Sequence, residues 1–74
     1  MKKTALVVIA NGFEEIEAVT PIDLLRRAET QVTVASAADS LDLTGKTEIV
    51  LRADALLDAC LGNEYDLLLL PGGP

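Results

Sequence analysis

The start of the chain joins a continuous apolar run to a helical pattern through a glycine. Residues 4–10 are almost entirely aliphatic, which predicts a first, central strand that is buried on both faces of a sheet. Asn11 and Gly12 then turn the chain. From Glu14 to Ala28 apolar residues recur at three- and four-residue steps, which predicts a helix. A strand, a tight turn and a helix in this order are the first unit of a parallel α/β sheet.

The remainder of the chain adds further strands and a short second helix. The predicted segments are a strand at 31–36, a loop or edge hairpin at 37–46, a short strand at 48–51 at the edge of the sheet, a helix at 54–60 and a last strand at 67–70. The sequence shows no internal repeat, low-complexity tract or linker. We therefore predict the α/β class, with one mostly parallel sheet.

The last predicted strand limits how complete the fold can be. Residues 67–70 are all leucine, so this strand needs cover on both faces. A chain of 74 residues buries only roughly 60% of its unfolded surface, and two helices cannot cover both faces and both edges of the sheet. We therefore expect residues 1–74 to be the N-terminal fragment of a single domain. The rest of the core would come from another segment, most simply the C-terminal remainder of the same polypeptide.

Composition narrows the classes of function. The net charge is −6, there is no histidine, and no basic cluster exists beyond Lys2-Lys3 and Arg26-Arg27. We therefore expect this segment not to bind nucleic acid directly, because such binding needs a positive surface for phosphates. One cysteine excludes an internal disulfide framework and suits a reducing compartment. The apolar run is too short to span a membrane, so we expect a cytoplasmic protein without membrane contact.

Three acids begin the predicted helix, where the helix dipole favours negative charge. For Glu14 and Glu15 we favour the interpretation of solvated acids at a helix start. Glu17 differs, because Pro21 lies four residues later and donates no hydrogen bond to the Glu17 carbonyl. The helix should therefore bend around Glu17. Since ligands of open α/β sheets bind at the carboxyl edge of the strands, Glu17 is a candidate site residue; a purely structural role is the alternative.

Cys60 is the only cysteine and therefore a possible nucleophile. A reactive thiol needs an electropositive and accessible setting, and the chain contains no histidine to activate it. Cys60 also lies on the apolar side of its predicted helix. We therefore predict a buried or half-buried structural thiol.

A pair of glycines follows the last predicted strand. Gly72 and Gly73 have no side chains, so the backbone there can approach a ligand closely and point N–H groups at it. A simple turn is the alternative interpretation.

The ThiJ/PfpI superfamily has an N-terminal signature that resembles residues 12–28 here, Gly-Phe-Glu-Glu-Ile-Glu-Ala-Val-Thr-Pro-Ile-Asp-Leu-Leu-Arg-Arg-Ala. The similarity is closest to the bacterial ThiJ-like branch, which is related to the parkinsonism-associated protein deglycase. It extends through residues 32–35, 53–55 and 65–73, and so covers nearly all of the 74 residues. One departure is Glu29-Thr30, where many relatives have a glycine after the helix.

The resemblance implies a flavodoxin-like open sheet with helices on both faces, in a homodimer. It implies that Glu17 hydrogen-bonds a catalytic cysteine beyond residue 74 and shares its proton. It further implies that the backbone N–H of Gly73 helps to form an oxyanion hole. Glu14 and Gly72 would line the same pocket, and Gly12 would shape the turn beneath it.

The implied reaction is attack by the thiolate on a small reactive carbonyl, such as methylglyoxal or its adducts with amines or thiols. Glu17 would handle protons, and water would release a hydroxy acid, as in a glyoxalase III-like or deglycase-type hydrolysis. No metal or organic cofactor is implied. The 74-residue chain alone would be inactive. The alternative is a redox-sensing, chaperone-like dimer of oxidative stress without true turnover.

Overall fold

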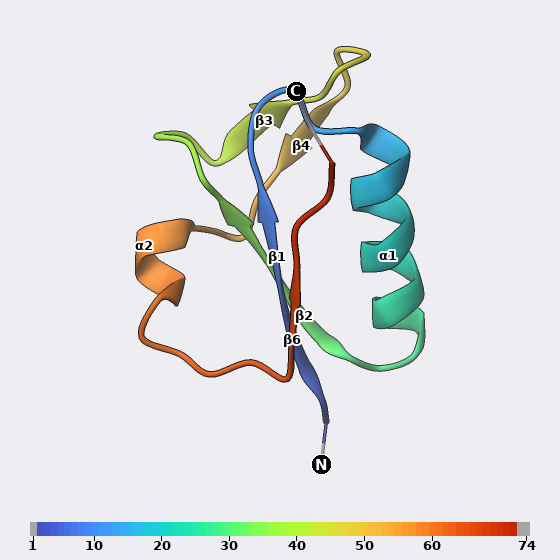
Figure 1. Cartoon of the computed structure of the whole chain (residues 1–74), viewed down its shortest axis with the longest axis vertical. Coiled ribbons are helices and arrows are strands. Elements are labelled where there is room, and N and C mark those ends of the chain that lie inside the picture. Colours follow the sequence, from blue (N-terminus) through green and yellow to red (C-terminus); the bar gives the residue numbers. More distant parts are fainter. Residues whose placement is uncertain (1, 73–74) are drawn as a thin grey trace.

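Strand β1 (Thr4–Ile9) lies inside a four-stranded sheet. The computed structural model describes residues 2–72. The other elements are α1 (Glu15–Arg27), β2 (Gln31–Ser36), β3 (Asp42–Thr44), β4 (Val50–Arg52), β5 (Ala55–Leu56), α2 (Leu57–Cys60) and β6 (Leu67–Leu69). Figure 1 shows α1 on one side of the sheet and α2 on the other, so the predicted α/β class is confirmed. Within residues 2–72, no helix is both long and apolar enough to cross a membrane.

The four strands of the main sheet run parallel in the order β5-β2-β1-β6. β1 pairs with β2 over its whole length, from Thr4 opposite Gln31 to Ile9 opposite Ser36. On its other side, β1 pairs with β6. The predicted inner position of the first strand is therefore confirmed. The chain extends the sheet first to one side of β1, through β2 and β5, and then places β6 on the opposite side.

Apolar side chains pack against both faces of the sheet. On the side of α1, the buried residues are Val7, Ile9, Phe13, Ala18, Ile22, Val34, Leu43 and Ala53. On the side of α2, they are Leu6, Ala35 and Cys60, with Tyr65 packed against them. Because burial of one Val or Leu side chain contributes about 1.5–3 kcal/mol, this packing holds both helices to the sheet.

Helix α1 agrees with its predicted range to one residue at each end. Glu14 precedes it in an extended conformation and Ala28 follows it. Pro21 lies inside the helix, which Figure 1 shows as one continuous coil, so the proline does not end it. The predicted bend around Glu17 stays a prediction. Just beyond the helix, Glu29 has φ 64°, the left-handed conformation that glycine adopts most readily.

The segment from 37 to 52 differs from the prediction. β3 and β4 pair with each other, antiparallel, in a separate two-stranded sheet. A strand at the edge of the main sheet was therefore the wrong placement for residues 48–51. The hairpin folds over the start of α1 because Leu43 is fully buried in the core and the loop bonds to Glu15. Neither contact is visible in the local sequence.

The predicted helix at 54–60 is helical only from Leu57 to Cys60. Ala55 and Leu56 form β5, which pairs with the end of β2. The reason lies in Asp54, whose backbone N–H donates to the Val34 carbonyl at 2.8 Å. The Asp54 carboxylate in turn accepts the Val34 N–H at 2.8 Å. These two bonds hold the chain alongside β2 before the helix begins.

Candidate functional site

The order of the strands points to one place for a ligand. In an open parallel sheet, ligands bind beyond the carboxyl ends of the strands, where the strand order reverses. Here β2 and β6 lie on opposite sides of β1, so the reversal lies between β1 and β6. The segments that follow these two strands are residues 10–14 and 70–72. Four of the five candidate site residues lie there or one turn into α1.

The backbone of Gly72 is held between two acids at the start of α1. The Glu14 N–H donates to the Gly72 carbonyl at 2.9 Å, and the Gly72 N–H donates to Glu17 Oε1 at 3.0 Å. An acid three positions after the N-cap residue often reaches back to that residue's own N–H. Here the Gly72 peptide lies between the two groups instead. The structure therefore brings Glu14, Glu17 and Gly72 together.

Gly72 has no room for a side chain. A Cβ atom added there would collide with Glu17 Oε1. Both Gly72 and Glu17 are exposed, so the carboxylate is open to solvent at the edge of the sheet. Gly73 lies outside the described residues. Its predicted role in an oxyanion hole therefore stays a prediction.

Gly12 shapes the turn that leads from β1 to α1. Its φ is 84°, which a residue with a side chain rarely adopts. Its N–H donates to the Thr44 carbonyl at 2.8 Å, and the Thr44 N–H donates to Asn11 Oδ1 at 2.9 Å. The turn is thus fastened to β3, below the site. Gly12 therefore supports the turn below the site. None of these bonds joins Gly12 to Glu17.

Glu15 is not the solvated acid that the sequence suggested. It is buried, and Oε2 accepts hydrogen bonds from the Thr47 N–H at 2.8 Å, the Thr47 hydroxyl at 2.7 Å and the Ile49 N–H at 3.4 Å. The hydrogen bond from the Thr47 hydroxyl is the main cause that lowers the pKa of Glu15. The prediction failed because all three donors lie more than 30 residues away in sequence, and no local signal marks them.

Glu14 forms an ion pair with the same loop. Lys46 Nζ lies 2.8 Å from Glu14 Oε1, and the Glu14 side chain is 39% exposed. The hydrogen bond and the charge of Glu14 raise the pKa of Lys46. Glu14 is therefore neither a free solvated acid nor a buried one. Lys46 has no local sequence signal of this role, because a lysine in a polar loop is ordinary.

Cys60 is buried, as predicted for a structural thiol. It is 3% exposed, and its Sγ lies 3.6 Å from the carbonyl oxygen of Leu56, the residue directly before α2. It belongs to the apolar cluster with Leu6 and Ala35, on the side of α2. Among residues 2–72, no group of three or more His, Cys, Asp or Glu side chains is placed to hold a metal ion.

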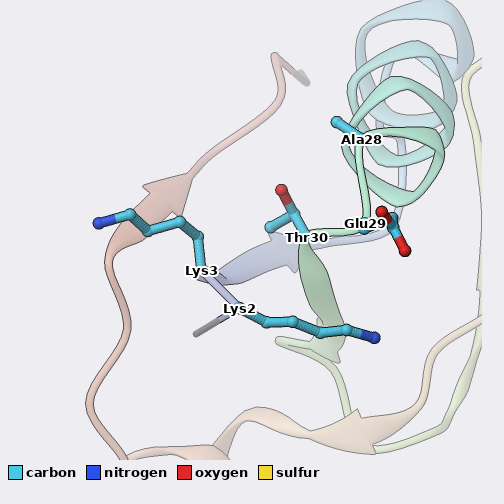
Figure 2. A pocket seen from close by; sticks show the side chains of 5 residues that line it. All are labelled: Lys2, Lys3, Ala28, Glu29 and Thr30. Atoms are coloured by element: carbon cyan, nitrogen blue, oxygen red, sulfur yellow. The ribbon is translucent and has the colours of Figure 1, made fainter.

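A hollow exists at the opposite edge of the sheet. It is lined by Lys2, Lys3, Ala28, Glu29 and Thr30. Figure 2 shows that the two lysine side chains point in different directions and do not converge on one point. The hollow lies at the amino ends of β1 and β2, where parallel sheets do not normally bind ligands. We therefore keep the candidate site at Glu17 and Gly72.

Comparison with known proteins gives one consistent result. The model of the DJ-1/PfpI family matches residues 3–74. Protein DJ-1 homolog B of Arabidopsis thaliana is 50% identical over 68 residues, which are 92% of this chain and 16% of that protein. A deglycase of Thermococcus kodakarensis is 34% identical over 68 residues, which are 92% of this chain and 40% of that protein.

Solved structures agree with the sequence comparison. The structure of oxidized Toxoplasma gondii DJ-1 superposes with a TM-score of 0.94 and 41% identity, over 96% of this chain and 39% of that one. The chain thus spans between 16% and 40% of the length of these relatives. Its fold matches the N-terminal part of the flavodoxin-like fold of DJ-1.

Proposed function

Because the chain belongs to the DJ-1/PfpI family, we propose that it supplies the N-terminal half of a cysteine-dependent site for reactive carbonyl compounds. The observation that carries the proposal is the contact between the Glu17 carboxylate and the Gly72 N–H, at the edge where the strand order reverses. The relative from Thermococcus kodakarensis is a deglycase, which supports this class of substrate. The nucleophile is a cysteine outside this chain.

In the proposed reaction, this chain supplies the acid–base group and the oxyanion donor, and a segment outside it supplies the cysteine. The thiolate adds to the carbonyl carbon of methylglyoxal or one of its adducts, and the electron pair of the C=O bond moves to the oxygen. The Gly73 N–H stabilises the oxyanion. Glu17 takes the proton from the former aldehyde carbon and returns it to the neighbouring carbonyl carbon, whose oxygen becomes a hydroxyl, and this shift leaves a thioester. Water then adds to the thioester carbonyl and the sulfur leaves, which releases the hydroxy acid and restores the thiol. When protonated, Glu17 also donates a hydrogen bond to the thiolate and favours the reactive form of the sulfur.

Exposed apolar residues support two proposed partners of this chain. Leu68 on β6 is 60% exposed, and Leu70 directly after β6 is 67% exposed. We propose that the C-terminal remainder of the polypeptide pairs with β6 and covers these leucines. Ile16 on α1 and Val50 on β4 are 79% and 63% exposed, and we propose that they face a second copy in a homodimer. A protein of this kind would work in the cytoplasm.

Turnover of methylglyoxal by the full-length protein, without added glutathione, tests the proposal. Glu17→Gln should lower kcat/KM by about 100-fold, the size expected for loss of a general acid–base group. Glu64→Gln is the matched control, because Glu64 is exposed and lies in the loop before β6. Equal activity of the two variants would contradict the role of Glu17.

A redox sensor is the second candidate, because the relative from Toxoplasma gondii has been solved in an oxidized form. In this case the wild-type protein would not turn over methylglyoxal at all. Its cysteine would instead oxidise, and Glu17→Gln would change the extent of oxidation by peroxide, measured by mass spectrometry. The two candidates are therefore separated by the activity of the wild-type protein before any variant is made.

A further inference from the structure

The turn between β3 and β4, residues 45–49, bonds to the side chains of two of the three acids at the start of α1. Glu15 accepts three hydrogen bonds from this hairpin turn, and Glu14 pairs with Lys46 at 2.8 Å. Glu17 instead accepts the Gly72 N–H. Three chemically identical side chains within four positions are thus given three different partners. The hairpin turn decides two of these pairings.

Glu14 and Glu17 both bond to the same glycine, Glu14 through its backbone and Glu17 through its carboxylate. Glu14 is the N-cap residue of α1 and Glu17 lies three positions later, the spacing at which the side chain of the later residue reaches the earlier one. The backbone of Glu14 already binds the Gly72 carbonyl at 2.9 Å. A Glu14 carboxylate turned toward Gly72 would therefore repel Glu17 and offer a second acceptor for its N–H.

Lys46 is fixed where it can prevent this competition. Its backbone N–H donates to the Phe13 carbonyl at 2.9 Å, directly before the N-cap residue. The hairpin turn is closed by the Gly45 N–H on the Ile49 carbonyl at 2.9 Å, and Gly45 lies against the Glu15 side chain. The pKa of Lys46 is raised first by its hydrogen bond to Glu14, and also by the charges of Glu17 and Glu15. The Lys46 ammonium group therefore interacts electrostatically with all three acids.

We propose that Lys46 is a positioning residue of the candidate site, which draws the Glu14 carboxylate toward the hairpin turn and so leaves the Gly72 N–H to Glu17. The meaning of this inference for catalysis rests on the proposed function of Glu17. Its test measures hydrogen exchange at the Gly72 amide and does not measure turnover. The inference and the proposed function can therefore fail separately.

Hydrogen exchange of the Gly72 amide, measured by NMR on the isotope-labelled full-length protein, tests the proposal. Lys46→Met should speed the exchange of Gly72 by about twofold to fivefold, the range for loss of one exposed ion pair. Lys46→Arg keeps the charge and should restore the wild-type rate. Lys2→Met removes an equal charge at the amino end of β1 and should change nothing. The amides of β1 report any global loss of stability.

The double variant separates positioning from general support of the fold. If Lys46 acts by holding Glu14 away, then Glu14→Gln should rescue Lys46→Met, because the neutral amide no longer repels Glu17. A purely structural lysine would not be rescued. The proposal is overturned if the two substitutions simply add, if Lys46→Met behaves like Lys2→Met, or if the wild-type Gly72 amide exchanges as fast as in an unfolded peptide.

Discussion

The Gly72 peptide is bonded on both sides to the first turn of α1, and its fit to Glu17 leaves no space for a methyl group. This contact joins two residues that are 55 positions apart in sequence. Sequence reasoning could mark both as candidates, from a proline four residues after an acid and from glycines after a strand. It could not pair them, because Pro21 marks Glu17 as unusual but no local signal shows that its carboxylate will accept the Gly72 N–H. The partners of all three acids lie far away in sequence.

Gly72→Ala should separate activity from stability. The added methyl group meets the end of a flexible side chain, so Glu17 can move away and the unfolding free energy should change by less than about 0.5 kcal/mol. The hydrogen bond between Glu17 and the Gly72 N–H would be lost, and we expect kcat/KM for methylglyoxal to fall by about tenfold or more. Gly62→Ala is the control, because no atom lies within 4 Å of a Cβ there. Equal kinetics for both variants would argue against this contact.

Glu15 should make the free energy of unfolding depend on pH. Its pKa is lowered in the folded state, so its contribution is complete above its ordinary value of 4.5 and is lost as the pH falls through the lowered value. Asp66 has the same sign, because the Thr4 backbone N–H lowers its pKa. Glu15→Gln should therefore be less stable than wild type above pH 4.5 and should lose less stability on acidification. Urea unfolding above and below this pH measures both; parallel curves would contradict the assignment.

At the scale of elements, local patterns predicted the segments that their own residues determine. β1, β2, β6 and α1 have continuous apolar runs or helical spacing, and their ranges agree with the structure closely. The β3–β4 hairpin and β5 depend on Leu43, Glu15 and Asp54, whose contacts join distant segments. For this reason local patterns place residues 48–51 at the edge of the main sheet and predict helix at residues 55–56, and the structure corrects both.

The end of α1 offers a stabilising substitution. Glu29 has φ 64°, which costs roughly 1–2 kcal/mol for a residue with a side chain. Part of the gain is offset, since glycine loses more freedom on folding. Glu29→Gly should therefore raise the unfolding free energy by about 0.5–1 kcal/mol. Glu64→Gly, at a position without positive φ, should not stabilise; an equal gain there would refute the explanation.

At the scale of the molecule, apolar residues lie exposed at the open side of β6. β6 is an edge strand of the sheet, and Leu67, Leu68 and Leu70 are 43%, 60% and 67% exposed. Edge strands with exposed apolar side chains pair readily with other chains. The uncovered last strand was predicted from its all-leucine composition alone. What would cover it cannot be read from composition, because any matching apolar strand would satisfy the same need.

The isolated chain should therefore self-associate, and a charge on β6 should reduce this. Leu68→Lys places an ammonium group on the exposed strand, a common means of blocking edge pairing. Leu61→Lys is the matched control, because Leu61 is 66% exposed but lies outside the sheet. Sedimentation velocity should show fewer oligomers for Leu68→Lys only. If both variants associate like the wild type, β6 is not the associating surface.

The reversal of strand order between β1 and β6 also has a consequence for the time at which the site forms. β1 is synthesised first, but its neighbour β6 is joined to it by bonds such as Thr4 with Asp66, 62 positions apart. Contacts of such sequence separation form late, because the long loop between them must close first. A nascent chain that ends before β6 can hold α1 and β2 in place while Glu17 still has no glycine to bind. The contact between Glu17 and Gly72 therefore cannot form until β6 has joined β1.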